Sequence, residues 1–150
     1  LAGVLDDRRE QLMRSGLRLD EQLPERPLWL WGDEVRLAQI FDNLLGNAIK
    51  FSKPSGTISL VAGRSDEWIV IRVADTGIGI RPDMLDRIFE PFAQDAPDVA
   101  RATGGLGIGL ALVRGLVELH EGTVTARSGG VGYGAEFEVR LPVGPSASPQ

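Results

Sequence analysis

Two asparagines one helical turn apart are the first residues in this chain that could bind a ligand. Asn43 and Asn47 lie between Asp33 and Lys50, where apolar residues recur at helical spacing. Asparagine is a poor residue inside a helix because its side chain competes for backbone hydrogen bonds. Its amide oxygen suits Mg²⁺, its NH₂ group can donate to phosphate, and Lys50 on the same face could neutralise phosphate charge. The alternative is an ordinary solvated helix face.

A carboxylate at the end of a β-rich run is the second such feature. Asp75 directly precedes a loop in which Gly77 and Gly79 allow a flat ligand to approach the backbone closely. A strand-end carboxylate can accept a hydrogen bond from an exocyclic amine there. The alternative is an aspartate that caps a turn or a helix. The Asp-Thr-Gly triplet also resembles aspartic proteases, but that chemistry needs a second such carboxylate and β context throughout, whereas a helix is expected after this loop.

A second glycine cluster, from Gly104 to Gly109, opens a helix that is expected to end at about Leu119. Backbone N–H groups and the helix dipole favour an anion such as pyrophosphate at this position. The cluster does not match the P-loop pattern, and no strand directly precedes it as a dinucleotide-binding fingerprint requires. A flexible hinge before the helix is the alternative.

Composition limits the remaining possibilities. The 150 residues fit one domain, and the absence of cysteine excludes a disulfide framework, a cysteine zinc site and a cysteine nucleophile. One histidine excludes a multi-histidine metal site within the chain, and the net charge of −5 argues against nucleic-acid binding. Glycine is enriched, at 19 residues, and no apolar run or signal peptide indicates a membrane or secreted segment.

The elements that must position these residues form an α+β mixture. Periodicity and turn residues predict helices over Val4–Ser15, Asp33–Lys50 and Pro82–Ile88, and after Gly109. Strands are expected over Leu17–Leu23, Leu28–Trp31, Thr57–Ala62, Trp68–Ala74, Gly122–Arg127 and Ala135–Leu141. Ala93–Thr103 lacks a steady period and is expected to be a mobile loop, and Pro142–Gln150 has the composition of a linker.

Five short motifs follow one another in a particular order. They are Asn43–Phe51, Asp75–Ile80, Phe89–Phe92, Gly104–Leu110 and Gly134–Phe137. In this order and at these spacings they resemble the N, G1, F, G2 and G3 boxes of the catalytic ATP-binding domain of sensor histidine kinases. That superfamily also contains gyrase-type and chaperone-type ATPases. The resemblance covers the chain from about Leu17 to Pro142.

The resemblance implies an α/β (α+β) two-layer sandwich of the Bergerat type. It implies a mixed sheet of about five to six strands, helices on one face, and a mobile ATP lid formed by Ala93–Thr103. Residues 1–16 would be an N-terminal helix leading from a dimerisation domain, residues 17–142 the catalytic domain, and residues 143–150 a tail.

The resemblance also implies ATP and Mg²⁺ as cofactors and a role for each matched residue. Asp75 would accept a hydrogen bond from the adenine amino group. Asn47 would coordinate Mg²⁺, and Asn43 and Lys50 would approach the phosphates. The catalytic candidates are Asn43, Asn47 and Lys50. Arg101 would contact phosphate from the lid, and Phe89 and Phe92 would lie at its hinge or simply pack in the core. The other nucleotide-binding candidates are Gly77, Ile78, Gly79, Ile80, Gly104, Gly105, Leu106, Gly107, Ile108, Gly109, Leu110 and Phe137.

The implied reaction is transfer of the γ-phosphoryl group to a histidine on a separate dimerisation domain. His120 is not expected to be that acceptor, because it lies after the second glycine cluster and Gly122 breaks the helix an acceptor needs. Gyrase-type and chaperone-type relatives carry a glutamate base where this chain has Asn43, so slow ATP hydrolysis is expected here. Two alternatives are a serine kinase of the anti-sigma-factor type and a nucleotide-sensing module without transfer.

The implied partners are the dimerisation domain of the same kinase and the receiver domain of a response regulator. Nucleic acid is not an expected partner. The isolated domain is expected to be monomeric and cytoplasmic, and the parent protein could be membrane-anchored.

Overall fold

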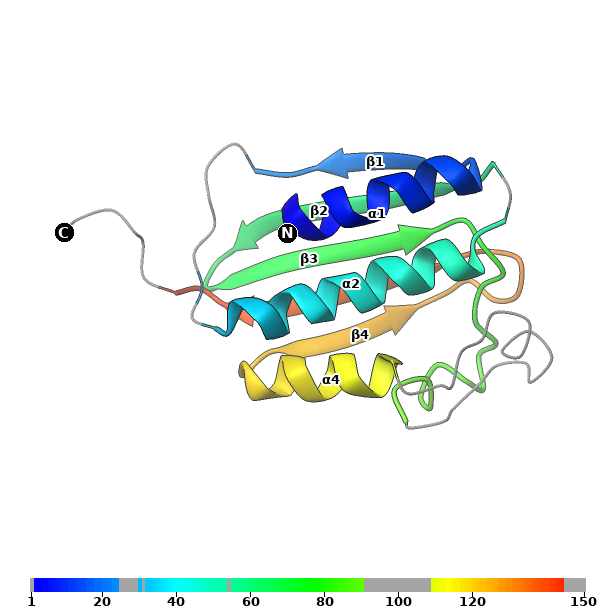
Figure 1. The fold of residues 1–150 in the computed structure, drawn as a ribbon. Coiled ribbons are helices and arrows are strands. Elements are labelled where there is room, and N and C mark those ends of the chain that lie inside the picture. The colour runs from blue at the N-terminus through cyan, green and yellow to red at the C-terminus, as the bar shows by residue number, and fades with distance from the viewer. Residues whose placement is uncertain (1, 25–29, 31, 54, 91–108, 145–150) are drawn as a thin grey trace.

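The computed structural model describes residues 2–24, 30, 32–53, 55–90 and 109–144. Within these ranges it contains three helices and five strands (Figure 1). In chain order they are α1 (Ala2–Ser15), β1 (Arg18–Gln22), α2 (Glu34–Phe51), β2 (Thr57–Ser65), β3 (Trp68–Asp75), α4 (Gly109–Leu119), β4 (Thr123–Arg127) and β5 (Ala135–Pro142). No helix in these ranges is both long and apolar enough to cross a membrane.

The five strands form one mixed sheet in the order β1-β2-β3-β5-β4. β1 pairs in parallel with β2, and every other pairing is antiparallel. α1, α2 and α4 lie together on one face of this sheet (Figure 1). The predicted two-layer α/β sandwich with a mixed sheet is therefore confirmed, with five strands in the described part of the chain.

The core lies between the helix layer and the sheet. α2 buries Phe41, Leu44, Leu45 and Ala48 as its apolar spacing predicts, and it also buries Ile40 and Ile49; Leu37 is only half-buried. These side chains form one cluster with the alternate residues of β3 and β5, such as Val73 and Val139. Each fully buried side chain of this size stabilises the fold by roughly 1.5–3 kcal/mol.

α1 belongs to the same core. Leu12 is 4% exposed within the cluster, and the helix ends at Ser15 as predicted. Gly16 has a φ of +67° and donates its N–H to Met13, while Leu17 donates to Leu12, which is the usual glycine-terminated helix end. The dimerisation domain expected before α1 stays a prediction.

Two local predictions were wrong in detail. The loop expected over Gly63–Glu67 shrinks to Asp66 and Glu67, because β2 keeps pairing with β3 through Ser65. The helix expected over Pro82–Ile88 is instead a series of turns with hydrogen bonds three residues apart, such as Met84 N–H to the Arg81 carbonyl at 2.9 Å. So short a segment gains too few hydrogen bonds to offset the cost of helix nucleation, and burial of Met84 anchors it instead.

Of the strand expected over Leu28–Trp31, only Leu30 is described, and it is not in a strand.

The face of the sheet opposite the helices carries a buried carboxylate. Glu138 is 7% exposed and lies between two arginines, with Oε1 2.9 Å from Arg72 Nε and Oε2 3.3 Å from Arg140 Nε. Burial by itself would raise the pKa of Glu138, but the hydrogen bonds and charges of the two arginines outweigh it and lower that pKa.

Replacing Glu138 with glutamine should therefore cost stability in a pH-dependent way. A lowered carboxyl pKa contributes stability above the ordinary glutamate value, and this contribution is lost as the pH falls through the lowered value. We expect Glu138→Gln to lose about 1–3 kcal/mol at pH 7, since the two arginines would face a neutral amide. Urea unfolding of both proteins at pH 7 and at acid pH measures this loss of stability. An equal loss of stability at both pH values would contradict the ion-pair explanation.

Candidate functional site

α2 presents the predicted asparagine and lysine stripe. The helix begins after Asp33, whose carboxylate accepts the N–H groups of Val35 and Arg36 at 2.9 and 3.2 Å and so caps it. Asn43, Asn47 and Lys50 follow on successive turns of α2, the two asparagines half-buried and the lysine exposed. The stripe is therefore separate from the face that α2 buries.

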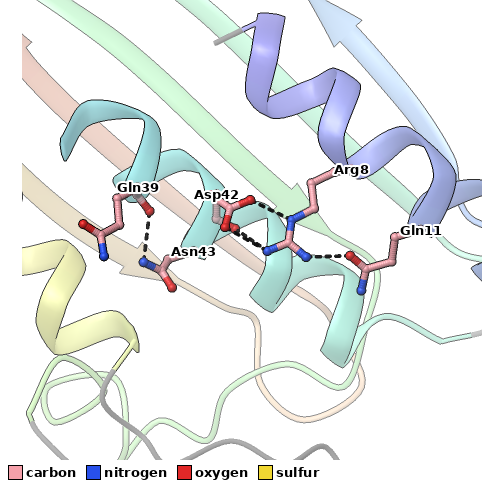
Figure 2. A network of polar contacts seen from close by, with 5 residues as sticks. All are labelled: Arg8, Gln11, Gln39, Asp42 and Asn43. Carbon is pink, nitrogen blue, oxygen red and sulfur yellow. Dashed lines mark hydrogen bonds and ion pairs between the residues drawn. The ribbon is translucent and has the colours of Figure 1, made fainter. Parts of the chain in front are cut away.

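Asn43 lies against the first residue of α4. Its Nδ2 donates to the Gln39 carbonyl at 3.0 Å (Figure 2), which fixes the amide and leaves Oδ1 directed elsewhere. A Cβ added to Gly109 would lie 3.6 Å from that oxygen, so the start of α4 and Asn43 are neighbours. The Asn47 side chain forms no hydrogen bond to any other residue that the structure describes, and its amide is thus available to a ligand.

Asp42, next to Asn43 in the sequence, serves a different purpose. Arg8 of α1 binds its carboxylate with two nitrogens, Nε to Oδ1 at 2.8 Å and Nη2 to Oδ2 at 3.1 Å (Figure 2). Gly46 makes room for this arginine, because a Cβ there would lie 2.9 Å from Nη2. Figure 2 shows Asp42 on the side of α2 that faces α1 and Asn43 on the other side. Asp42 is therefore not a free base beside Asn43.

The end of β3 carries Asp75 into the first glycine loop. Asp75 is half-buried, and its Oδ1 accepts the Gly77 N–H at 2.8 Å. Burial raises the pKa of this carboxyl, although backbone hydrogen bonds from Gly77 and Ala135 oppose the shift. The Gly77 bond to Oδ1 thus helps to shape the loop, and the carboxylate oxygens, with several lone pairs, can also accept a donor from a ligand.

The loop after Asp75 is held between α2 and the turn that joins β4 to β5. The Ile78 N–H donates to the Phe51 carbonyl at 3.1 Å, at the end of α2. On the other side, the Gly132 and Gly134 N–H groups donate to the carbonyls of Ile78 and Gly77 at 2.7 and 3.1 Å. Backbone therefore contacts backbone on both sides of the loop.

This close approach explains why two positions in the loop are glycine. A Cβ on Gly77 would lie 2.0 Å from the Phe51 carbonyl oxygen. Gly79 has a φ of +76°, and a Cβ there would lie 2.1 Å from the Gly130 carbonyl oxygen. Ile78 is half-buried and Ile80 is buried in the core. The loop is thus a fixed part of the fold.

The last of the five motifs, Gly134–Phe137, leads into β5. Phe137, in β5, is 6% exposed and packs edge-on against Phe89 with ring centroids 6.1 Å apart. Both rings therefore pack on the core side, which agrees with the core-packing alternative for Phe89. Any contact of Phe137 with a nucleotide stays a prediction.

Several candidates from the sequence lie outside the described residues. They are Phe92, Arg101, Gly104, Gly105, Leu106, Gly107 and Ile108, together with the expected lid over Ala93–Thr103. Of the second glycine cluster, Gly109 and the half-buried Leu110 are described, and both begin α4. Their roles toward a nucleotide stay predictions.

His120 has partners on both ring nitrogens. Nδ1 lies 2.7 Å from the Leu116 carbonyl, and Nε2 accepts the Asp33 N–H at 3.1 Å. A carbonyl can only accept, so the proton lies on Nδ1 and Nε2 joins the end of α4 to the start of α2. This environment agrees with the expectation of a structural histidine.

Sequence reasoning missed one residue of this region, Ser128. Its hydroxyl lies within hydrogen-bonding distance of Ile80, Gly130 and Gly134. The only signal in the sequence is a serine directly before a glycine-rich turn, which is also common in turns without any further role.

Comparison with known proteins agrees with this arrangement. Residues 32–145 match the family described as histidine kinase-, DNA gyrase B-, and HSP90-like ATPase. The autoinducer 2 sensor kinase/phosphatase LuxQ of Vibrio parahaemolyticus is 44% identical over 120 residues, which cover 76% of this chain and 14% of LuxQ.

Solved structures give the same result. The mycobacterial sensor histidine kinase MprB matches with a TM-score of 0.80 at 26% identity, covering 97% of this chain and 95% of that one. Full-length ShkA in complex with AMPPNP matches with a TM-score of 0.78 at 35% identity, covering 99% of this chain and 31% of ShkA.

The chain belongs to the family of histidine kinase-, DNA gyrase B- and HSP90-like ATPases, and its two-layer sandwich with a glycine loop at the end of β3 is an ATP-binding domain of that family. Its relatives are sensor histidine kinases, and it corresponds to their ATP-binding catalytic domain. The chain spans 14 to 29% of the length of the first curated relatives it matches.

Proposed function

We propose that this chain binds Mg·ATP and presents the γ-phosphoryl group to a histidine on a separate dimerisation domain of its parent protein. The observation that carries the proposal is the pairing of two sites in one fold. Asp75 and its glycine loop end β3, and the Asn43–Asn47–Lys50 stripe lies on α2, whose last residue binds that loop. Adenine and phosphates need two such adjoining sites.

In this proposal the Asp75 carboxylate accepts a hydrogen bond from the adenine amino group, while its Oδ1 also accepts the Gly77 N–H. The base would lie close to the backbone of the loop at Gly79, where the direction that a Cβ would take is filled by the Gly130 carbonyl. Asn43 and Lys50 approach the phosphates from α2, with Gly109 at the start of α4 beside Asn43. A helix start favours negative charge, which agrees with phosphates at this position.

The described residues fit a magnesium ion that is held mainly by ATP. Asn47 offers a neutral oxygen without a hydrogen-bond partner in the described part of the chain, a ligand type that Mg²⁺ accepts. No group of three or more acidic or histidine side chains gathers among the described residues. This agrees with an ion bound by a single side chain, phosphates and water. When bound, the ion would neutralise phosphate charge.

The chain's own residues favour transfer over hydrolysis. Asn43 cannot take a proton from water at neutral pH, and the neighbouring carboxylate of Asp42 is bound to Arg8. Phosphoryl transfer needs mostly positioning and charge neutralisation, so this domain can supply the nucleotide while a partner supplies the nucleophile. Both ring nitrogens of His120 are already used, which supports an acceptor outside this chain.

We further propose that the domain acts in the cytoplasm as a monomeric unit of a larger kinase. Its partners would be the dimerisation domain of that kinase and, downstream, the receiver domain of a response regulator. The short coverage of its curated relatives supports such a multidomain parent.

Labelled ATP and the histidine-bearing helix pair of the parent protein test the proposal. We expect label on histidine that is acid-labile and base-stable, lost in Asn47→Ala and retained in Gln39→Ala, which changes an exposed amide of α2 one turn before Asn43. Label on a partner serine would instead support the anti-sigma-factor type. ATP binding without any transfer would support a sensing module, and either result would contradict the proposal.

A further inference from the structure

Ser128 joins three separate segments through one hydroxyl group. It follows β4 directly and is half-buried. Its Oγ accepts the Ile80 N–H at 3.0 Å, lies 2.6 Å from the Gly134 carbonyl and accepts the Gly130 N–H at 3.2 Å. The Gly130 carbonyl lies further away, at 3.3 Å.

These contacts use the full hydrogen-bonding capacity of the hydroxyl. A serine hydroxyl donates one proton and accepts at two lone pairs. The short contact makes Gly134 the preferred acceptor of that proton, which leaves the lone pairs for Ile80 and Gly130. Since no other described residue accepts the Ile80 N–H, removing the hydroxyl would leave this part-buried donor without a protein partner.

The two ends of the loop after Asp75 are thus held by different elements. Ile78 is bound to the end of α2 through the Phe51 carbonyl, and Ile80 is bound to Ser128. The β4–β5 turn that Ser128 closes also meets the start of the loop, because a Cβ on Gly134 would lie 2.1 Å from the Asp75 carbonyl oxygen. The hydroxyl therefore adds a link at Ile80 to the two backbone bonds by which Gly132 and Gly134 already hold Ile78 and Gly77.

We infer that Ser128 is a positioning residue for nucleotide binding: it holds the Gly77–Ile80 loop at the place where adenine lies beside Asp75. This inference rests on the proposed adenine site. Among the residues that the structure describes, the Ser128 hydroxyl hydrogen-bonds only to backbone atoms, so it acts through the loop.

The test replaces Ser128 with alanine, and with threonine, which keeps the hydroxyl. We expect Ser128→Ala to bind ATP about tenfold more weakly by calorimetry, and Ser128→Thr to stay within threefold of the wild type. Ser59→Ala is the matched control, because Ser59 is half-buried in β2 and its hydroxyl bonds to no described residue. Ile69→Val controls for lost stability, since Ile69 is a core residue at the opposite end of β3 from Asp75.

Amide hydrogen exchange measured by NMR without nucleotide gives a second readout. In Ser128→Ala the amides of Ile80 and Gly130 should exchange at least tenfold faster, while in Ile69→Val they should not. A folded Ser128→Ala protein that binds ATP within twofold of the wild type would overturn the inference. If Ser128→Ala does not fold, rapid exchange of the Ile80 amide in the wild type overturns it, and slow exchange supports it.

The same experiments separate this inference from the proposed function. The exchange rate of the Ile80 amide reports, without any nucleotide, whether Ser128 protects this end of the loop. Unchanged ATP affinity in Asp75→Asn would contradict the adenine assignment, whatever the exchange rates show.

Discussion

Asp75→Asn should weaken ATP binding by about 10- to 100-fold while leaving the fold at least as stable as the wild type. Asparagine has nearly the same size and can still accept the Gly77 N–H that Asp75 accepts at 2.8 Å. It places an NH₂ donor, however, where the adenine amino group needs an acceptor. Losing a hydrogen bond to a charged group and leaving two donors face to face costs roughly 1.5–3 kcal/mol, or about 10- to 100-fold in affinity.

The stability part of this expectation follows from the pKa of Asp75. Burial raises that pKa, so the folded state disfavours the carboxylate. A raised carboxyl pKa adds stability below the ordinary aspartate value, and this is lost as the pH rises through the raised value. The wild type therefore carries the full cost of the buried charge at neutral pH, and the neutral asparagine does not.

Calorimetric titration with Mg·ATP at pH 7 measures the affinity, and thermal unfolding at neutral and acid pH measures the stability. Asp66→Asn is the matched control, because Asp66 is an exposed aspartate in the β2–β3 turn, at the opposite end of β3 from Asp75. The stability gain of Asp75→Asn over the wild type should shrink at acid pH. A variant that binds ATP as tightly as the wild type would refute the role of Asp75.

Gly79→Ala should have the largest effect on the fold itself. A φ of +76° is unfavourable for alanine by about 1–2 kcal/mol, and the new methyl group would lie 2.1 Å from the Gly130 carbonyl oxygen. Backbone must move to relieve that overlap, and overpacking of this kind costs about 1–3 kcal/mol more. We therefore expect a loss of about 2–5 kcal/mol, together with weaker ATP binding, because Gly79 lies in the loop beside Asp75.

Gly63→Ala provides the comparison. Gly63 lies within β2, and a Cβ there would meet no atom within 4 Å. We expect its free energy of unfolding, measured in urea, to stay within about 1 kcal/mol of the wild type, because glycine in a strand is if anything unfavourable. Equal effects of the two substitutions would show that the Gly79 contacts do not matter.

The long helix shows how far sequence reasoning reaches. The apolar spacing of Phe41, Leu44, Leu45 and Ala48 predicts the buried face of α2, and Asp33 predicts its start; both are confirmed. The stripe with Asn43 and Asn47 follows from the same period of 3.6 residues. Such predictions succeed because they depend on residues only a few positions apart, whose relative geometry the helix itself determines.

The short segment after Ile80 shows where this reasoning fails. Proline and the following residues are compatible with a helix over Pro82–Ile88, yet the chain makes separate turns there around the buried Met84. In so short a segment tertiary contacts outweigh intrinsic propensity, because few internal hydrogen bonds are at stake.

By itself, the sequence determined the α2 helix, the positions of the glycine loops and, through five motifs in order, the family to which the chain belongs. Only the tertiary structure decided that Arg8 binds Asp42, that His120 joins α4 to α2, and that Ser128 supports the loop after Asp75. Each of these contacts links residues 34 or more positions apart. Local spacing carries no information about such pairs, because packing of the helices on the sheet brings them together.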